Sequence, residues 1–415
     1  MAGRCECYLG FTPRSPANHA VLRFWALYGN YNGGEYNYPL QTAVEKLTNA
    51  PYSTISALEP KPAAVLAVLD QRLHLTYDRR RPSACVIEGA QVSKHMRLIH
   101  VAPAHDGFVY SGYFSEPFLA EAGAHALSAW RKDYNKVAVE TLAHGMEAVL
   151  STQVDTGELV GRLILMLAYD HAVESFTKPV ANPQPHPPHF SEGVDVEAFL
   201  RSLISKEHVE NVLSSKPIDL PSSSGSASDL DLPLRKAFSN ASVRFTHFIQ
   251  TTDDVHVDLA RTALCRSAAI ICKHIQEAVD LVIPVVLNRN SRMVKEEITA
   301  IFIKCKLQAG CSSPTLDIDL DSIRFFGPGR VPYIVVTMDL GKDHEEVEYS
   351  PARPIWSTKE APNTLDDTHL RYPIAIRGCS NRVYVVIDSG EEALYKKLLG
   401  NGMLSEQPST RKGES

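Results

Sequence analysis

The feature that most constrains the fold of this chain is a series of short, continuously apolar runs after about residue 262. They read SAAIICKH, VDLVIPVVLN, TAIFIKCK, VPYIVVTMDLG, YPIAIRGC and RVYVVIDS. A strand with one wet face alternates apolar and polar residues, whereas a strand covered on both faces is apolar throughout. The runs therefore predict a mixed β-sheet flanked by helices. The last two predict an antiparallel hairpin at the sheet edge, because only residues 378–381 separate them.

The first half of the chain has helical periodicity instead. This is strongest in TGELVGRLILMLAYDHAVESF, where Thr156 is predicted to cap the helix. Two later segments, VDVEAFLRSLISKEHVENVL and LPLRKAFSNASVRFTHFIQ, also carry apolar residues at helical spacing and are predicted helices. The predicted fold class is α/β, with a helical N-terminal half followed by a mixed sheet.

The length and the changes in composition predict the domain organisation. A chain of 415 residues exceeds what one core usually fills. We predict an N-terminal, partly irregular and helical region over residues 1–150, an α/β domain over 151–400 and a disordered tail over 401–415. Within the second domain, PIDLPSSSGSASDLDLP predicts a flexible linker over about 213–232, because Ser, Gly and Pro bury too little apolar surface to offset the ordering entropy.

Composition and motifs exclude several classes of protein. The net charge of −6 gives no global sign of nucleic-acid binding. Eight scattered cysteines and the lack of a signal-peptide pattern predict an intracellular protein, nuclear or cytoplasmic. No apolar run reaches the length of a membrane span, so we predict no membrane association. The patterns GxxxxGK[ST], GxSxG, HExxH and CxxC are all absent.

Charged residues at the ends of two neighbouring apolar runs form the candidate site. Asp280 lies near the start of VDLVIPVVLN, and Lys304 and Lys306 end AIFIKCK. Magnesium-dependent phosphodiester cleavage needs carboxylates to hold the metal and a lysine to orient water and stabilise developing charge. The short connection predicts that the two runs are adjacent strands, with Asp280 and Lys306 on the same side at one end.

The stretches GELVGRLILMLAYDHAV, CKHIQEAVDLVIPVVL and IFIKCK resemble a group of uncharacterised fungal proteins, mostly from mushroom-forming species. In that group a nuclease-like IQVK stands where this chain has IKCK, and some members are similar to Crinkler and retrotransposon-hot-spot-like proteins. The resemblance covers about residues 155–390. It implies a restriction-endonuclease-like core of the PD-(D/E)xK type, with an acid on one strand, a (D/E)xK or QxK triplet on the next, and a glutamate from a preceding helix.

The resemblance also implies roles for individual residues. Asp280, Lys304 and Lys306 would occupy the catalytic strand positions, and Glu158, which matches the GELV of the family, would be the helix glutamate, with Glu277 as the alternative. Asp280 and Glu158 would then hold Mg²⁺. The chain departs from the family at Lys304, because a protonated lysine cannot ligate a metal.

We therefore expect a degenerate nuclease-like protein that is impaired in cleavage, or lacks it, and that binds nucleic acid. The alternative is a non-enzymatic protein-interaction module of a fungal mobile-element or effector-like family. An active magnesium nuclease ranks third.

Each candidate residue also has a purely structural interpretation. Asp280 is at a position where an acid commonly caps a turn. Lys304 and Lys306 alternate along the chain and would suit the solvated end of an edge strand. Glu158 falls in the first turn of a predicted helix, where the helix dipole favours an acid in any protein. The nuclease-like hypothesis depends on the combination of these residues.

Overall fold

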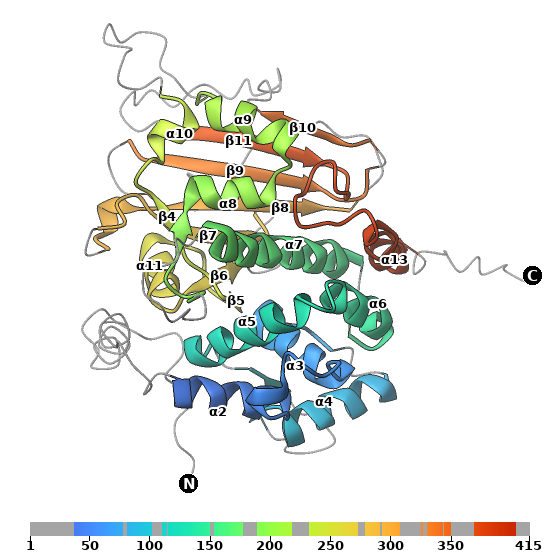
Figure 1. Ribbon diagram of the computed structural model, residues 1–415. Helices are drawn as coiled ribbons and strands as arrows, with labels where there is room; N and C mark the ends of the chain where they lie inside the picture. The colour runs from blue at the N-terminus through green and yellow to red at the C-terminus, as the bar shows by residue number, and fades with distance from the viewer. Residues whose placement is uncertain are drawn as a thin grey trace, which may run out of the picture.

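The computed structural model describes thirteen stretches of the chain. These are residues 37–77, 81–101, 110–113, 115–149, 153–176, 189–217, 232–272, 279–290, 293–307, 325–326, 330–342, 344–349 and 369–403. A group of helices forms one half of the molecule and a large sheet the other, with the long helix α7 (Gln153–Phe176) between them (Figure 1). The predicted mixed α/β class, with a helical N-terminal half, is confirmed at this level.

Several helices and a small two-stranded sheet form the N-terminal part of the molecule. They are α2 (Asn37–Thr48), the 3-10 helix η2 (Tyr52–Thr54), α3 (Pro62–Leu73), α4 (Pro82–Lys94), α5 (Pro117–Arg131) and α6 (Val137–Val149), with strands β1 (Leu98–Val101) and β2 (Tyr110–Gly112). Three of these helices begin with proline, whose fixed φ and missing N–H suit the first helical position.

Helix α7 is buried along most of its length because it packs against both halves of the molecule. From Leu159 to Tyr169 its apolar side chains are nearly excluded from solvent. Thr156 does not cap it. The helix begins at Gln153, so Thr156 lies inside it and is buried. The prediction of the cap was wrong because a threonine that caps a helix and a threonine inside the helix look the same in sequence.

In the described part of the chain, the large sheet has nine strands. In the order β10-β11-β9-β8-β7-β4-β3 they are β10 (Glu346–Tyr349), β11 (Leu370–Arg377), β9 (Pro332–Asp339), β8 (Ile298–Lys306), β7 (Leu281–Val286), β4 (Ser242–Val243) and β3 (Val194–Asp195), and β6 (Ala268–Ile271) joins β7 to β5 (His247–Gln250). Strand β8 runs antiparallel to β7 and parallel to β9, and β11 is parallel to β9. The sheet is therefore mixed.

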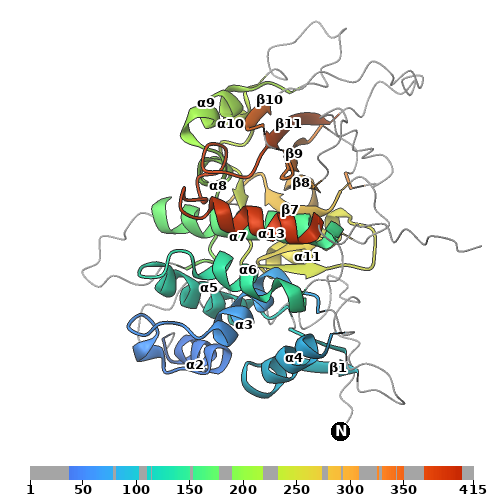
Figure 2. The ribbon, with the colours of Figure 1, turned by 90° about the vertical axis from the view of Figure 1, so that its right-hand side faces the viewer.

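Helices cover both faces of this sheet, as the continuously apolar strands predict. The remaining elements are α8 (Val196–Leu203), α9 (Lys206–Ser214), α10 (Leu234–Ala237), α11 (Val257–Cys265), the 3-10 helix η3 (Lys295–Glu297) and α13 (Glu392–Met403). Along β8, Ile301 and Ile303 face the core shared with α7, whereas Ala300 and Phe302 face a second core shared with α11. The two views show α7 and α11 on opposite sides of the sheet (Figures 1 and 2).

Two predicted elements differ from the structure. Helical spacing in LPLRKAFSNASVRFTHFIQ produces only the short helix α10, and the rest forms β4 and β5. The run RVYVVIDS is not a strand and makes a single bridge between Tyr384 and Ile204. It cannot pair with β11 because β9 occupies one edge of that strand and β10 the other.

The remaining predictions about organisation lie partly outside the described residues. The predicted linker begins inside α9, and its residues 218–231 are not described. Helix α13 reaches Met403, and residues 404–415 of the predicted tail are not described either. One continuous core cluster contains residues from Leu40 to Leu399, on both sides of the predicted boundary at residue 150. In the part of the chain that the structure describes, no helix is both long and apolar enough to span a bilayer.

Candidate functional site

Asp280 and Lys304 face each other across the antiparallel pair β7 and β8. Leu281 pairs with Ile303, so the residue before Leu281 lies opposite the residue after Ile303. Asp280 continues the ladder, because its amide donates to the Ile303 carbonyl over 3.0 Å and its carbonyl accepts from the Cys272 amide over 2.8 Å. The acid is therefore held at a defined position at the end of the sheet.

Both oxygens of the Asp280 carboxylate already have partners. Lys304 Nζ lies 2.7 Å from Oδ1, and the backbone amide of Cys305 donates to Oδ2, also over 2.7 Å. The side chain of Asp280 is 9% exposed and that of Lys304 is 23% exposed, so water screens the pair only partly. Asp280 is thus more than a turn-capping acid: it forms a partly buried ion pair.

The lysine that contacts Asp280 is Lys304, and Lys306 was predicted only to lie on the same side as Asp280 at one end of the strands. Lys306 lies two residues further along, on the same face by strand alternation, and in register with Asp339 of β9. Burial raises the pKa of Asp339, and the positive charges of Lys342, Lys306 and Arg377 oppose this rise. Because β8 lies between β7 and β9, the interpretation of the lysines as the end of an edge strand was wrong.

Two glycines allow the start of α7 to lie directly on the end of β8. A Cβ on Gly161 would be 2.5 Å from the Cys305 sulfur, and one on Gly157 would be 3.3 Å from the Cβ of Leu307. Glu158, between these glycines, is half-buried in the same region. The structure therefore brings Glu158, Asp280 and Lys304 to one end of the sheet. The alternative glutamate, Glu277, lies outside the described residues.

Two thiols lie close to these acids and are kept protonated. Burial raises the pKa of Cys272 and of Cys305, and the negative charges of Asp280 and Glu158 add to the effect. A thiol that stays protonated is a poor nucleophile and a poor metal ligand. Cysteine chemistry at this site is therefore disfavoured.

The side chains at this site do not offer the free oxygen ligands that Mg²⁺ needs. The ion prefers several oxygen ligands, but Asp280 is engaged by an ammonium group and a backbone amide. Among the described residues, no three His, Cys, Asp or Glu side chains are grouped to hold a metal ion. The assignment of Asp280 and Glu158 as metal ligands stays a prediction, and its obstacle is Lys304.

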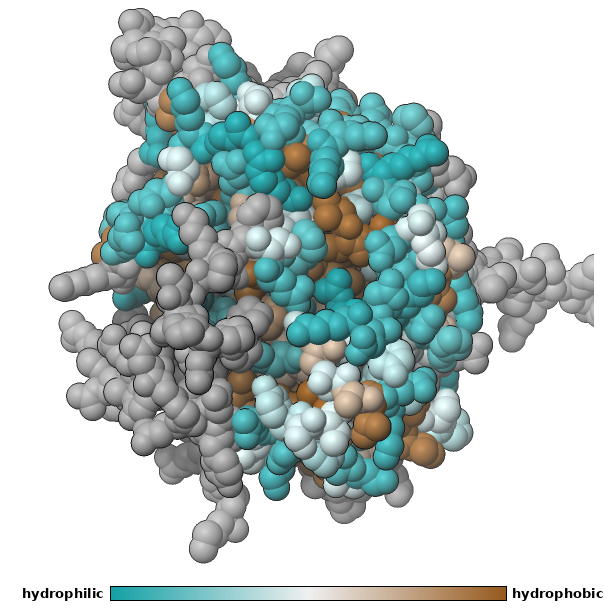
Figure 3. Space-filling view, in the orientation of Figure 1, coloured by the Kyte–Doolittle hydropathy of each residue, from teal (hydrophilic) through white to brown (hydrophobic). Residues whose placement is uncertain are grey.

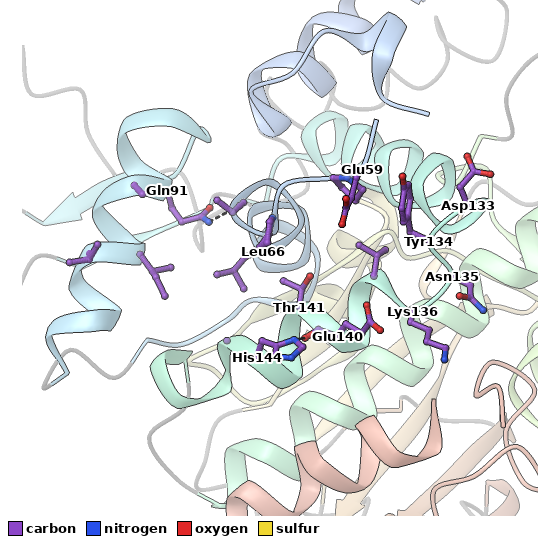
Figure 4. A pocket seen from close by; sticks show the side chains of 18 residues that line it. Glu59, Leu66, Gln91, Asp133, Tyr134, Asn135, Lys136, Glu140, Thr141 and His144 are labelled. Atoms are coloured by element: carbon purple, nitrogen blue, oxygen red, sulfur yellow. Dashed lines mark hydrogen bonds between the residues drawn. The ribbon is translucent and has the colours of Figure 1, made fainter. Parts of the chain in front are cut away.

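A separate groove lies among the N-terminal helices. It has a volume of about 670 Å³ and is lined by residues of α3, α4 and α6 and of the turns that precede α3 and α6, including apolar Leu66 and Val137 (Figure 4). The carboxylates of Glu59 and Glu140 flank it. Hydrophobic side chains are visible over α4 on this face, where Val86 is 72% exposed (Figure 3). The groove does not include Asp280.

The fold and this site define a mixed α/β protein with an acid and a lysine paired at the end of two central strands. Comparison with family models, with curated proteins and with solved structures gives no match. Functional conclusions therefore depend on the geometry of the residues.

Proposed function

We propose that this chain is a nuclease-like protein in which an internal ion pair closes the catalytic position, so that it does not cleave phosphodiester bonds. One observation carries the proposal, namely the 2.7 Å contact between Lys304 Nζ and Asp280 Oδ1. The ammonium group takes the position next to the carboxylate that a catalytic divalent ion would need.

The arrangement of elements supports a relationship to the PD-(D/E)xK nucleases. The acid Asp280 begins one strand and the triplet from Lys304 to Lys306 ends its antiparallel neighbour. Glu158 comes from a helix that precedes both strands and packs against β8. These three positions correspond to those that the proposed nuclease-like core would use.

Electrostatics explain why such a site would not bind a metal. A divalent ion about 4 Å from a protonated lysine is disfavoured by on the order of several kcal/mol, even at an effective dielectric constant near 20. Binding would also break the pair that partly neutralises Asp280. The metal-free ion pair is therefore the more stable arrangement.

The test is calorimetric titration of Mn²⁺ into purified protein. We expect no measurable binding by the wild type. Lys304→Glu should bind Mn²⁺ at least tenfold more tightly than the detection limit, because the change removes a repelling charge and adds a carboxylate. The gain should disappear in Lys304→Glu/Asp280→Ala. Lys397→Glu makes the same charge change on the exposed face of α13 and is the matched control.

Two results would contradict the proposal. One is Mg²⁺- or Mn²⁺-dependent cleavage of DNA or RNA by the wild type above the level of Asp280→Ala. The other is a gain in Mn²⁺ affinity in Lys304→Glu that survives the loss of Asp280, since the two residues would then not share a site. Titration of DNA and RNA duplexes at two salt concentrations tests the nucleic-acid binding that we expect from the sequence.

A second candidate function is a non-enzymatic protein-interaction module. The groove among α3, α4 and α6 favours it, because Val86 and Leu58 are exposed there or close by and apolar surface at a hollow is common at interfaces. Val86→Glu should weaken binding of a protein partner at this groove and should leave the Mn²⁺ titrations unchanged.

A further inference from the structure

A second polar cluster lies between the N-terminal helices and the sheet. Ser115 precedes α5, His247 begins β5, and Arg266 follows α11. Ser115 Oγ lies 2.8 Å from His247 Nε2, and Arg266 Nε donates to Ser115 Oγ over 3.0 Å. His247 is 1% exposed. Three segments that are distant in sequence thus place a hydroxyl, an imidazole and a guanidinium in direct contact.

The hydrogen bonds of this cluster have one consistent direction. Thr246 Oγ1 donates to the carbonyl of Ser267 and lies 3.1 Å from His247 Nδ1. Thr246 Oγ1 has a single proton, and when that proton is given to the carbonyl, Thr246 Oγ1 accepts from Nδ1–H. A neutral imidazole has one N–H, which leaves Nε2 as the acceptor. Arginine can only donate, so the Ser115 hydroxyl accepts from Arg266 and gives its proton to His247 Nε2.

The same three side chains line a cavity of about 200 Å³. Its walls include the apolar side chains of Phe248, Ile249 and Leu259. A hydroxyl that donates to an imidazole and accepts from a guanidinium keeps one oxygen lone pair for a further partner. Most of the other residues that line the cavity are polar, and its small volume admits a short acyl group rather than a large ligand.

We propose that Ser115 is the nucleophile of a small acyl-transfer site, with His247 as its base and Arg266 as the cation that stabilises negative charge developing on Ser115 Oγ, acting on esters of short carboxylic acids. A nucleophile bonded to a base that is itself oriented by a third group is the arrangement that this chemistry requires. The site shares no residue with the pair Asp280 and Lys304, so this inference does not rest on the proposed function.

The reaction is balanced as an ordinary ester cleavage. Ser115 Oγ bonds to the acyl carbon as its proton moves to His247 Nε2. The bond between the acyl carbon and the alcohol oxygen then breaks, and the leaving alkoxide takes the proton from His247. Water then attacks the acyl carbon as His247 Nε2 takes one of its protons. The bond between the acyl carbon and Ser115 Oγ breaks, and His247 returns the proton to Oγ, giving the free acid and the original hydroxyl. Water is the only co-reactant, and no oxidant or metal is needed.

The surroundings of His247 give the site a pH signature. Burial lowers the pKa of His247 to about 3, and Arg266, Arg72 and His74 contribute to the decrease. Asp70 also lines the cavity but is ion-paired with Arg97. Because His247 is already neutral at pH 5, the rate of acylation should stay nearly constant from pH 5 to 9, and it should be slow, because a base with so low a pKa takes up the serine proton weakly. An unperturbed histidine, with a pKa near 6.5, would lose about tenfold per pH unit below that value.

The test is labelling with a fluorophosphonate, which forms an oxygen–phosphorus bond to an activated serine and releases fluoride. We expect one adduct on the wild type, mapped to Ser115 by peptide mass spectrometry, with a rate that changes less than threefold between pH 5 and 9. Ser115→Ala should remove the adduct, and Arg266→Gln should slow labelling at least tenfold. Ser93→Ala, at an exposed serine of α4, should label at the wild-type rate.

Three outcomes would overturn the inference. They are no adduct at Ser115 in the wild type, a labelling rate that rises with hydroxide concentration as for an unactivated serine, and an unchanged rate in folded His247→Gln. The first two use the wild type alone, so they decide the matter even if a substitution at the buried His247 prevents folding. Release of p-nitrophenol from p-nitrophenyl acetate, lost in Ser115→Ala, would extend the result from labelling to turnover.

Discussion

Arg72 of α3 and Asp170 of α7 form a two-pronged ion pair that is excluded from solvent. Two guanidinium nitrogens lie 2.7 Å from the two carboxylate oxygens, and the side chains are 0% and 1% exposed. Arg72 Nε also donates to the carbonyl of Thr246 over 2.8 Å. This pair therefore connects the N-terminal helices, α7 and the segment that leads into β5.

Breaking this ion pair should be far more costly than replacing it. Arg72→Met or Asp170→Leu alone leaves one buried charge without its partner, and we expect each to lower the free energy of unfolding by about 3–5 kcal/mol. The double substitution should recover at least half of that loss, because no charge stays buried. Urea unfolding of the four proteins measures this. Additive losses would show that the two residues do not act as a pair.

The contact between Gly161 and Cys305 gives a second test of the packing of α7 on β8. A methyl group at Gly161 would lie 2.5 Å from the Cys305 sulfur, and overpacking of this kind typically costs about 1–3 kcal/mol. We expect Gly161→Ala to be destabilised and Gly161→Ala/Cys305→Ala to regain most of the loss. Thermal unfolding is a sufficient measurement.

Gly145 of α6 provides the matched control. Among the described residues no atom lies within 4 Å of a Cβ placed there, and alanine is favoured over glycine in a helix by up to about 1 kcal/mol. Gly145→Ala should therefore be neutral or stabilising. If Gly161→Ala behaves in the same way, α7 does not approach β8 as closely as the structure indicates.

The sequence predicted those parts of the fold that depend on local composition. The continuous apolar runs predicted β6, β7, β8, β9 and β11, because burial on both faces leaves a signal in each strand by itself. The apolar spacing over residues 234–250 was ambiguous, since short windows cannot distinguish a helix from two short strands that pair with distant partners. The run over 382–389 has strand composition, but both edges of β11, the strand it was predicted to pair with, are occupied by β9 and β10.

The candidate site, like the fold, could be predicted only in part from the sequence. That Asp280 and a lysine of β8 lie together was predictable from the short connection between two strands. The sequence could not predict which lysine makes the contact. Lys304 and Lys306 are only two residues apart, and the register of the two strands decides which of them lies opposite Asp280. The contact between Ser115 and His247 spans 132 positions and involves no recognisable motif. Only the folded arrangement reveals it.

Asp70 should make stability depend on pH in an unusual direction. Burial raises the pKa of this carboxyl to about 6, although its ion pair with Arg97 opposes the rise. Between about pH 4 and 6 the folded protein therefore binds more protons at Asp70 than the unfolded chain does. The contribution of this group to stability increases as the pH falls through that window, by on the order of 2–3 kcal/mol at most.

This effect is measurable as a difference between variants. The unfolding free energy of the wild type, minus that of Asp70→Asn, should rise as the pH is lowered from 7 to 4. Urea unfolding at several pH values gives this difference. Asp253→Asn, at an exposed carboxylate, is the control and should show no comparable trend. A difference that falls with decreasing pH would mean that the ion pair with Arg97 outweighs the burial of Asp70.

The two partners of the candidate site should contribute unequally to stability. Asp280 serves both Lys304 and the amide of Cys305, so Asp280→Ala leaves two donors without their acceptor and should cost about 2–4 kcal/mol. Lys304→Gln removes one partner, from a partly exposed position, and keeps the bond from the Cys305 amide. We expect it to cost about 1 kcal/mol or less.

The effect of Mn²⁺ on the melting temperature distinguishes a metal site that Lys304 blocks from a site that has no affinity for metal. Lys304→Gln introduces the glutamine that the IQVK pattern has at this position. It also removes the positive charge that would repel a metal ion at Asp280. Millimolar Mn²⁺ should raise its melting temperature and leave that of the wild type unchanged, because a ligand that binds only the folded state stabilises it. Lys306→Gln removes a lysine that is in register with Asp339, and it should gain nothing. Equal shifts in both variants would show that manganese responds to net charge, and that Lys304 does not close the site.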